Sequence, residues 1–507
     1  MARRTRGAAL LRTAFWVRWL VPVLLLATVV HGCTTGINPV SGNRRALAYS
    51  WEQELELGKQ ADQQIVQQFG LYDNEEVQQY VERLGQDILE ESHMRRPDTR
   101  EEFRNTEFTF RVLDSPVVNA FALPGGYVYV TRGLLAHLNN EAQLAVVLGH
   151  EIAHVAARHA SQQAARQQLT QLGLIAGAIG GELAGLPGGD ILQLGSQATQ
   201  LLFLRYSRDN ERESDNLGVE YAAMNGYAVG EAAGFFESLE RLQEQSGGGL
   251  PTWQSSHPDP GAREQEMREL AEAGREELGR PLDKVERDVY YSTIENIVLG
   301  DNPRQGFTRD DMFYHPDLQF QFPVPPRFEV VNQPTAVLMV GPEQEAIVQF
   351  TVSEENSPRA AAAQLTENQG IRVVQQGEVR AGGLPAFQVE ALAQTQQGQQ
   401  LRLLAHYVEY EGRVYEFIGY TLADNFDAYR SAFLQTMRGF APLNDPEILD
   451  VEPTRLVVRP AERTAPFRDL VPADLPEGFS EEGLAILNQV ELDEQIEQGR
   501  PLKLPAE

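Results

Sequence analysis

Two histidines and a glutamate within residues 149–155 have the spacing of a metal-binding hydrolytic site. His150 and His154 are four positions apart, and Glu151 directly follows the first histidine. On a helix, residues four apart share one face, so both imidazoles could bind one metal ion, with Glu151 beside its water ligand. The spacing predicts a zinc site in which Glu151 acts as the general base.

The neighbouring residues favour a helix across this motif. Apolar side chains recur at helical spacing and form one stripe, which consists of Leu144, Val147, Leu148, Ile152 and Val155. The two histidines project along one border of the stripe, so we expect the metal site at the edge of a hydrophobic core. The alternative interpretation is a pair of helix histidines with a solvated glutamate between them.

A catalytic zinc ion also needs a third protein ligand and an open position for water. His159 comes one residue too early for the third histidine of metzincins and would face away from His150, so we interpret it as a surface or packing residue. Glu211 and Asp215 are four apart and would share a helix face. One could bind the metal while the other orients a ligand. Glu213 is also a carboxylate, but it would point to another face.

The full pattern is similar to that of a known peptidase family. HEIAH followed about fifty residues later by Ser-Arg-x-x-Glu-x-x-x-Asp resembles the gluzincins that include HtpX, the CAAX prenyl proteases, the Oma-type mitochondrial proteases and the periplasmic BepA-like proteases. The resemblance implies that the zinc ligands are His150, His154 and Glu211. It further implies Glu151 as the base and Asp215 as an acid that supports a ligand or donates a proton.

A segment upstream of the motif extends the resemblance. Residues 117–130 have the pattern of a strand, a Pro-Gly-Gly turn and a second strand. In the family, a similar segment is an edge strand against which the substrate lies extended, which implies substrate binding by Asn119, Ala120, Phe121 and Ala122. An exposed edge binds a peptide through its backbone with little regard to side chains. An ordinary core hairpin is the alternative.

A downstream loop matches the same family. Residues 256–263 resemble the His-Pro-x-x-x-x-Arg segment of BepA-like proteins, in which a loop histidine lies over the zinc. By that resemblance His257 would be a fourth ligand that displaces the catalytic water and makes the enzyme latent. His257 could instead stabilise the oxyanion of the reaction, as a catalytic residue. A loop histidine before a proline without any function is the third interpretation.

The amino terminus has the pattern of an export signal. An apolar run that ends at Gly32 and Cys33 follows five arginines, which are Arg3, Arg4, Arg6, Arg12 and Arg18. The run is too short for a comfortable membrane span. Cys33 is the only cysteine, and its position resembles the lipobox of bacterial lipoproteins. The resemblance implies a lipidated Cys33 and a periplasm-facing outer-membrane lipoprotein of a Gram-negative bacterium.

Charge argues against two classes of partner. The chain has 72 acidic and 43 basic residues, a formal net charge of −29. Removal of the five signal arginines leaves a charge of about −34. Such a charge disfavours nucleic acids and anionic membrane surfaces as direct partners. We therefore expect no nucleic acid partner, and attachment to the outer membrane through a lipid anchor.

Length and pattern changes predict an α+β chain with several domains. The 507 residues, 42% of them hydrophobic, are enough for two or three domains with real cores. The predicted segments are a signal peptide 1–32, a mainly helical gluzincin-type zinc metallopeptidase domain with a small sheet 33–285, a connector 286–312, an α+β domain 313–442 and a small module 453–504.

The two carboxy-terminal segments carry weaker resemblances. Residues 313–325 resemble the start of PsbP/Mog-like domains, which implies binding or scaffolding. Residues 455–504 resemble a degenerate LysM module that lacks the usual Gly-Asp after its first strand, so glycan binding is doubtful. Between the predicted ligand helices, the stretch 172–195 is rich in Gly, Ala and Leu and could be a lid or a buried helical hairpin.

These patterns predict a zinc endopeptidase with one catalytic zinc ion. Its expected substrates are extended, unfolded or misassembled envelope polypeptides. One alternative is an envelope assembly factor or chaperone with little proteolysis. A second is a mainly scaffolding lipoprotein whose carboxy-terminal modules are the working part. In either case these modules could contact assembly machinery or the cell wall.

Overall fold

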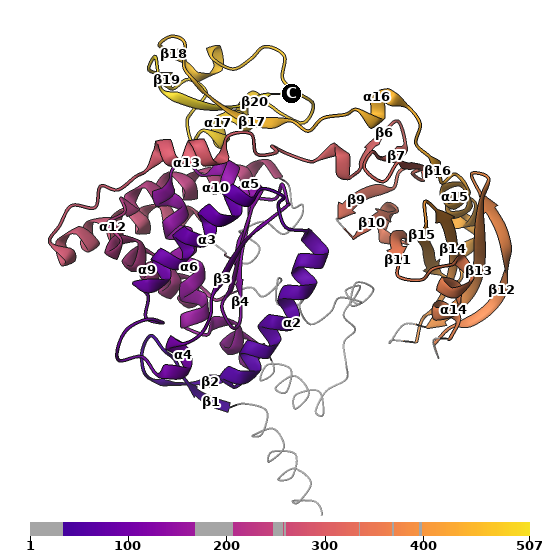
Figure 1. Ribbon diagram of the computed structural model, residues 1–507, viewed down its shortest axis with the longest axis horizontal. Coiled ribbons are helices and arrows are strands. Elements are labelled where there is room, and N and C mark those ends of the chain that lie inside the picture. Colours follow the sequence, from indigo (N-terminus) through magenta and orange to yellow (C-terminus); the bar gives the residue numbers. More distant parts are fainter. Residues whose placement is uncertain are drawn as a thin grey trace, which may run out of the picture.

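The computed structural model describes residues 34–167, 206–246, 257, 260–333, 335–367, 370–394 and 398–506. These residues form two lobes, and the carboxy terminus lies back on the first of them (Figure 1). The predicted signal peptide 1–32, the predicted lipidation site Cys33 and the stretch 172–195 lie outside the described residues. None of the described helices combines the length and the apolar composition that a membrane span requires.

The first lobe begins with a short hairpin and two long helices. The hairpin consists of β1 (Thr34–Ile37) and β2 (Arg44–Leu47), and the helices are α2 (Trp51–Phe69) and α3 (Glu75–Glu90), followed by the short α4 (Glu101–Arg104). The side chains of Ser50 and Asn74 accept a hydrogen bond from a first-turn amide and so begin α2 and α3. Gln53 bonds back to the amide of Ser50, which makes a capping box.

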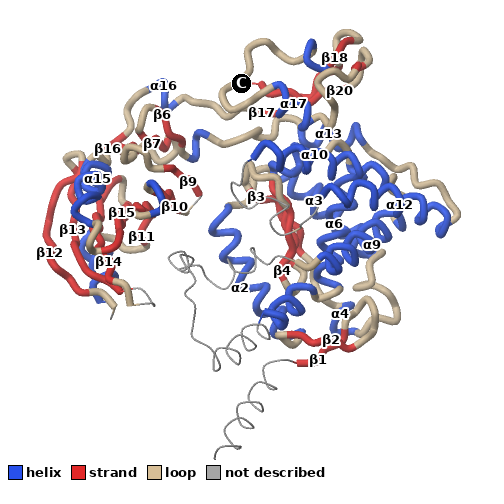
Figure 2. Tube along the Cα trace, turned by 180° about the vertical axis from the view of Figure 1, so that it is seen from behind, coloured by secondary structure: helices blue, strands red, loops and turns tan. Residues whose placement is uncertain are grey.

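A three-stranded sheet lies beside α2. Its strands are β3 (Thr109–Leu113), β5 (Tyr127–Thr131) and β4 (Ala120–Leu123), in that order across the sheet. β4 and β5 are antiparallel, and the turn between them uses positive φ angles at Gly125 (85°) and Gly126 (100°). β4 is therefore an edge strand, at the place where the sequence predicts one. Figure 2 shows this sheet between α2 and the remaining helices.

The remaining helices of the first lobe surround one central helix. They are α5 (Arg132–His137), the central α6 (Glu141–Ala156), α9 (Arg208–Met224), α10 (Ala232–Ser246), α12 (Pro260–Leu278) and α13 (Arg287–Ile294), with the 3-10 turn η1 (Val229–Glu231). Every residue of α6 is buried. The helix contacts α3, α9, α10 and β4, and its two histidines are buried.

The second lobe is built on a seven-stranded antiparallel sheet. Its order is β12 (Arg372–Ala381), β13 (Leu384–Gln394), β14 (Gln400–Tyr410), β15 (Arg413–Leu422), β11 (Ala346–Ser353), β10 (Ala336–Val340) and β9 (Glu329–Gln333). The helices α14 (Pro358–Glu367) and α15 (Phe426–Arg438) cover opposite faces, because α14 packs against Leu403 and Ala405 while α15 packs against the alternate residues Leu404 and Val408.

A smaller four-stranded sheet packs against α15. Its order is β16 (Ala441–Pro442), β8 (Phe320–Pro323), β7 (Met312–His315) and β6 (Phe307–Arg309), and the 3-10 turns η2 (Pro303–Gln305) and η3 (Pro342–Gln344) belong to the same lobe. Phe320 and Phe322 of β8 fill the core between the two sheets and α15. The lobe is α+β, as the alternating strand patterns predict.

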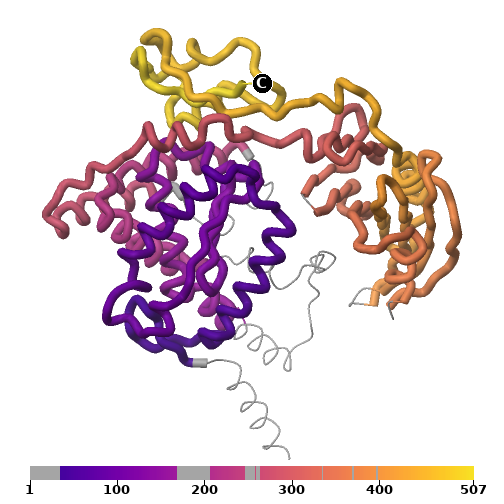
Figure 3. The backbone as a smooth tube through the Cα atoms, in the orientation of Figure 1, coloured from indigo at the N-terminus to yellow at the C-terminus, as the bar shows by residue number. Residues whose placement is uncertain are grey.

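The last part of the chain returns to the first lobe. After α16 (Pro446–Leu449), it consists of β17 (Arg455–Pro460), β18 (Ala465–Pro466), η4 (Phe467–Asp469), α17 (Glu481–Leu487), β19 (Gln495–Ile496) and β20 (Pro501–Ala506). Figure 3 shows the chain crossing to the second lobe and coming back beside the outgoing segment. Leu456, Phe467, Leu484 and Leu502 belong to the same hydrophobic core as α6.

Part of the predicted connector 286–312 also belongs to the first lobe. Tyr290, Ile294 and Ile297 are fully buried in the main core. The backbone N–H of Asn296 donates to Leu456 O (2.8 Å), and the N–H of Leu456 donates to Ile297 O (2.9 Å). The segment lacks a regular apolar repeat, so its pattern indicated a connector, whereas its burial depends on a strand about 160 residues later.

Candidate metal centre

Four buried side chains bring their ligand atoms together in the first lobe. They are His150, His154, Glu211 and His257, and one atom from each lies within 4.8 Å of the others. Nε2 of His150 lies 2.9 Å from Nε2 of His154 and 3.2 Å from Nδ1 of His257. The carboxylate of Glu211 lies 3.1 Å from Nδ1 of His257 and 3.7 Å from Nε2 of His150.

Three parts of the chain supply this group. α6 places His150 and His154 one turn apart on one face, as the spacing predicts. α9 supplies Glu211 from its first turn, after Ser207 begins the helix by accepting a hydrogen bond from Asn210. His257 stands just before α12.

The donor set fits a zinc ion. Bonds of 2.0–2.1 Å to a tetrahedral zinc separate neighbouring ligand atoms by about 3.4 Å, close to the distances between the four side chains. Zinc also requires neutral imidazoles. Burial, reinforced by the Arg263 guanidinium for His150 and by its neighbour His150 for His154, holds the pKa of both α6 histidines well below the usual range.

Glu151 lies beside the group and is almost completely buried. Burial raises the pKa of its carboxyl to about 7, which suits a group that accepts and returns a proton near neutral pH. Neither oxygen makes a hydrogen bond to the described residues, and Oε1 lies 3.6 Å from Nε2 of His257. The backbone amide of Ala122 on β4 acts to lower the same pKa, so the carboxyl faces the edge strand.

Glu211 and His257 lie next to each other at the centre, and each shifts the pKa of the other. Burial alone would raise the pKa of Glu211, but His257, His150 and Arg263 outweigh it and lower that pKa. Burial alone would lower the pKa of His257, but the carboxylates of Glu211 and Glu151 outweigh it and raise that pKa. The two groups thus shift each other's pKa in opposite directions, each toward its charged form.

Asp215 supports His150 from behind. Its Oδ1 lies 2.9 Å from Nδ1 of His150, the ring nitrogen that points away from the ligand group. Arg263 of α12 donates through Nε to Asp215 Oδ2 (2.9 Å), donates through a second nitrogen to Oδ1, and reaches Glu211 Oε2 at 3.3 Å. A carboxylate in this position fixes the tautomer and the orientation of a metal-ligating histidine. Of the two roles that the resemblance implies for Asp215, this geometry favours support of a ligand.

His154 is supported by a different set of residues. Nδ1 of His159 lies 3.1 Å from Nδ1 of His154, and Nε2 of His159 lies 3.2 Å from Glu213 Oε2. Arg45 of β2 pairs with both oxygens of Glu213 at 3.0 and 2.9 Å. His159 is a packing residue, as one of the two predicted alternatives has it, and it does not lie on the surface. The helix ends at Ala156 and turns at residue 158, so His159 comes back, fully buried, against His154.

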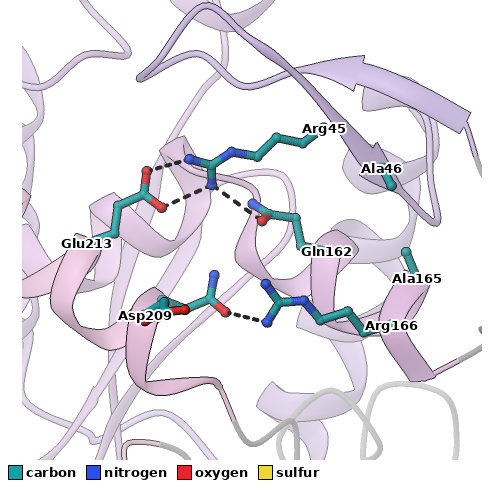
Figure 4. A pocket seen from close by; sticks show the side chains of 8 residues that line it. Arg45, Ala46, Gln162, Ala165, Arg166, Asp209 and Glu213 are labelled. Carbon is teal, nitrogen blue, oxygen red and sulfur yellow. Dashed lines mark hydrogen bonds and ion pairs between the residues drawn. The ribbon is translucent and has the colours of Figure 1, made fainter. Parts of the chain in front are cut away.

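A cavity of about 430 Å³ lies beside this second support and not at the ligand group. It is lined by Arg45, Ala46, Gln162, Ala165, Arg166, Asp209, Asn210 and Glu213. Figure 4 shows Arg45 reaching across it to Glu213 and Gln162. None of the four candidate ligands lines the cavity. Glu213, the rival ligand by residue type, therefore faces Arg45 and His159 instead of the ligand group.

Two residues at the site carry no role in the sequence interpretation. The ring of Tyr206 lies over that of His154, with 4.1 Å between their centroids, and both are buried. Arg263 is the last residue of the His-Pro-x-x-x-x-Arg pattern, so its spacing from His257 could have indicated a role at the site. Its contact with Asp215 could not be predicted in this way, because it joins α12 to α9 and no local sequence pattern relates these two helices.

The predicted substrate strand lies next to Glu151. Asn119 accepts a hydrogen bond from the N–H of Thr131 on β5 through its backbone oxygen (3.0 Å), so alternation directs the backbone groups of Ala120 and Ala122 toward the open edge. The ring of Phe121 instead packs against Tyr129 with 4.8 Å between centroids. The available contacts on this strand are backbone groups.

Comparisons with known proteins identify the central part of the chain. Residues 75–271 match the model of peptidase family M48. Over 166 residues the chain is 37% identical to the mitochondrial metalloendopeptidase OMA1 of Bos taurus, a match that covers 31% of each chain. A putative beta-barrel assembly-enhancing protease of Vibrio cholerae is 31% identical over 200 residues, which are 38% of this chain and 39% of that relative. The beta-barrel assembly-enhancing protease of Escherichia coli is 26% identical over 279 residues, 54% of each chain.

The matched regions span less than two thirds of each of these relatives. The match agrees with the predicted peptidase family over residues 75–271, and these relatives are named as a metalloendopeptidase and as proteases. M48 peptidases use zinc, and the described ligand group could hold one metal ion.

Similar solved structures include two small proteins. Cyanobacterial PsbP from Synechocystis has a TM-score of 0.23 and 14% identity, over 26% of this chain and 91% of its own. The Ran-binding protein Mog1p of Saccharomyces cerevisiae has a TM-score of 0.21 and 14% identity, over 28% of this chain and 99% of its own. The PsbP/Mog-like and LysM-like resemblances stay predictions.

Proposed function

We propose, from the premise that residues 75–271 form a peptidase family M48 domain, that this chain is a zinc endopeptidase of the bacterial envelope. Its substrates would be extended, misfolded or misassembled envelope polypeptides. The observation that carries the proposal is the convergence of four buried ligand residues beside the carboxylate of Glu151, which makes no hydrogen bond to the described residues.

The ligand roles follow from the contacts. His150, His154 and Glu211 would hold the zinc ion, because each points a neutral imidazole nitrogen or a carboxylate oxygen at the others. Asp215 would keep His150 in the ligating tautomer. Zinc bound there would activate water as the nucleophile and polarise the substrate carbonyl.

Glu151 would carry the proton through the reaction. Its carboxylate can accept the proton of the attacking water because its pKa, raised by burial to about 7, is close to neutral pH. The same group can then deliver that proton to the nitrogen of the leaving amine. Because the carboxyl faces β4, a peptide bond presented at that edge would come within its reach.

The substrate would bind to the edge of β4 as an added strand. The backbone groups of Ala120 and Ala122 are directed to the open edge, and main-chain hydrogen bonds select extended chains without selecting side chains. A folded protein does not offer a free extended segment. This mode of binding supports misfolded or unassembled polypeptides as substrates.

His257 would regulate access to the zinc ion. Its Nδ1 lies within 3.2 Å of ligand atoms of both His150 and Glu211, which is where a fourth ligand would lie. A fourth protein ligand leaves no open position for water, so the resting enzyme would be nearly inactive. Substrate binding would have to displace His257.

The cellular location is proposed from the amino terminus and the relatives. The sequence pattern favours export and a lipidated Cys33, and two of the relatives are named as beta-barrel assembly-enhancing proteases. We place the protein on the periplasmic side of the outer membrane. Mass spectrometry of the mature amino terminus tests this proposal, and an unmodified chain that retains residues 1–32 contradicts it.

The Glu151→Gln variant tests the enzymatic proposal. It should retain about one zinc ion per chain, because Glu151 is not a ligand, and should lose roughly a hundredfold to ten-thousandfold in peptidase rate. His150→Ala, His154→Ala and Glu211→Ala should lose the metal itself. Full activity of Glu151→Gln, or loss of its zinc, would refute the assigned roles.

The His257→Ala variant tests the regulatory role separately. Increased proteolysis of a casein-like protein, with unchanged zinc content, is the expected result. Decreased activity would instead assign His257 to stabilisation of the oxyanion, and unchanged activity would leave it without a role.

A second function is favoured by the same closed geometry. With His257 at the fourth position, the β4 edge could still bind extended polypeptides while hydrolysis stays slow. The chain would then act as an assembly factor or chaperone for envelope proteins. Cells whose only copy of the protein carries Glu151→Gln distinguish the two functions. Assembly of envelope proteins should continue in these cells if the protein is a chaperone and should fail if it acts by proteolysis.

A further inference from the structure

The carboxy-terminal residues bond to the segment that begins the metal-bearing helix. α5 ends at His137, and α6 begins four residues later. Nζ of Lys503 donates to the backbone oxygens of Ala136 (2.5 Å) and Leu138 (2.9 Å). The side-chain amide of Gln489 donates to the oxygen between them, that of His137, at 2.9 Å. Three consecutive carbonyls thus have donors from more than 340 residues away.

These carbonyls need partners for a general reason. The last carbonyls of a helix have no partner within the helix. α5 has only six residues, too few to form a stable helix by itself. Lys503 is fully buried, and its side-chain nitrogen donates to these carbonyls and not to solvent.

A second set of bonds reaches the first turn of α6. The side-chain amides of Gln489 and Gln143 donate to each other at 3.1 and 2.7 Å. The side chain of Asn139 donates to the backbone oxygen of Asn488 at 3.0 Å. Asn488 is bonded in turn to the backbone N–H and oxygen of Lys503. The contacts with α5 and with α6 are therefore parts of one connected set of hydrogen bonds.

Apolar packing continues across the same boundary. Leu484, Leu487 and Leu502 belong to the hydrophobic core that contains α6. Arg241 of α10 adds polar contacts, with Nη1 donating to Val490 O at 2.8 Å and Nη2 to Glu482 at 2.7 Å. Figure 1 shows the carboxy-terminal elements on top of α5, α10 and α13. An independently folded binding module would not share its core in this way.

We propose that residues 455–506 are a structural latch that sets the position of α6 and with it the geometry of the metal centre. Lys503 and Gln489 are its positioning residues. The latch belongs to the first lobe, and residues 303–443 are an insertion between two parts of one folding unit. The effect of the latch on the metal centre rests on the proposed function. The contacts between the latch and α5 and α6 do not depend on catalysis.

The Lys503→Met variant of the full chain tests the latch. Methionine keeps an unbranched apolar side chain and removes the amino group that bonds to Ala136 and Leu138. The matched control is Arg463→Met, because Arg463 is exposed on the same module and donates only to Asp469 O within it. The measurements are the apparent zinc Kd by chelator competition, kcat and KM on a casein-like protein, and hydrogen exchange of residues 134–150.

The expected result is specific to a positioning role. Lys503→Met should raise the apparent zinc Kd by roughly twofold to thirtyfold and lower kcat more than it raises KM, at temperatures well below unfolding. Exchange of the amides of residues 138–143 should become faster. Arg463→Met should behave as the unchanged protein. A Lys503→Met protein that melts earlier but keeps its zinc affinity and its exchange at α6 overturns the proposal.

The unaltered protein provides a second test that needs no variant. Hydrogen exchange at increasing denaturant should show that amides of residues 484–503 and of residues 134–150 lose protection in one step, because a latch and its target open together. Loss of protection in the module while residues 134–150 stay protected overturns the latch. Both tests measure zinc binding or hydrogen exchange. Neither needs peptidase activity, so they can still support or overturn the latch if the proposed peptidase function proves wrong.

Discussion

Gly149 of α6 and Gly218 of α9 touch through their backbones. A Cβ atom at Gly149 would lie 2.7 Å from Gly218 O, and a Cβ at Gly218 would lie 2.7 Å from the backbone nitrogen of His150. The two helices therefore cross at the residue before the first histidine of the motif. This close approach allows Glu211 and Asp215 of α9 to reach both nitrogens of His150.

A single methyl group at this crossing should weaken the metal site. In Gly218→Ala the helices must separate by several tenths of an ångström or more, since the opposing atoms are backbone. We expect the apparent zinc Kd to rise at least tenfold and the protein to lose about 1–3 kcal/mol of stability by overpacking. Chelator competition and thermal unfolding measure the two effects.

Gly274→Ala is the matched control for this prediction. Gly274 also lies in a helix, α12, but a Cβ there meets its nearest neighbour at 3.8 Å, an ordinary contact. This variant should keep its zinc affinity and gain slightly in stability, because alanine is the better helix former. Equal zinc affinities in Gly218→Ala and Gly274→Ala would contradict the role of the crossing.

Two acidic residues of α9 hold the proposed zinc-ligand histidines in place, one by direct contact and the other through an intervening histidine. Asp215 contacts the ligand His150 itself, whereas Glu213 contacts His159, which in turn contacts His154. Asp215→Ala should weaken zinc binding by roughly 10–100-fold and also destabilise the fold, because it leaves the buried Arg263 without its main partner. Glu213→Ala should keep its zinc with a smaller loss of affinity, since Glu213 is half-buried and remote from the ligand group.

The two variants are compared by zinc titration and thermal unfolding. A larger loss of zinc affinity in Glu213→Ala than in Asp215→Ala would reverse the assigned order of the two supports. It would also reopen the assignment of Glu213 as a ligand, which residue type alone permits.

The local part of the site could be predicted from the sequence. The spacing of His150 and His154 depends only on the helical repeat, and the same repeat pairs Glu211 with Asp215. The β4 edge strand ends at a turn marked by two glycines that take positive φ angles. In each case the determining interactions lie within a few residues of the motif.

The part that could not be predicted depends on contacts between distant segments. Nothing near Lys503 indicates that it bonds to α5, and the burial of the whole of α6 follows from its neighbours and not from its own stripe. His159 reaches His154 because residue 158 adopts a left-handed conformation that few non-glycine residues take. Tertiary packing decides these features, and local patterns do not encode it.

Substrate capture by the β4 backbone predicts a specific effect of proline. Ala122→Pro removes the N–H that faces the open edge, and proline is tolerated on edge strands with that geometry. We expect a higher KM for unfolded proteins, by roughly twofold to tenfold for the loss of one hydrogen bond, with zinc content unchanged. Unchanged KM in a zinc-loaded Ala122→Pro protein would remove β4 from the substrate site.

The second lobe should lose stability in mild acid because of a buried histidine. His406 on β14 is fully buried, and its Nε2 donates to Gln388 Oε1 at 3.0 Å. Burial, with a smaller contribution from Arg438, lowers its pKa to about 4, so the folded lobe holds the neutral imidazole. The unfolded chain takes up a proton below about pH 6.5. The stabilising contribution is therefore complete above pH 6.5 and is lost as the pH falls toward 4.

The size of this loss can be measured in the full chain. Between pH 7 and pH 5 it should amount to about 2 kcal/mol for one such histidine. Hydrogen exchange of β14 amides, corrected for the intrinsic exchange rate at each pH, gives the opening free energy of this lobe alone. His406→Gln should remove about 2 kcal/mol of the dependence, while His315, whose pKa burial also lowers to about 4, accounts for a similar share. An opening free energy that changes equally with pH in His406→Gln and in the unaltered protein would show that His406 does not titrate with unfolding.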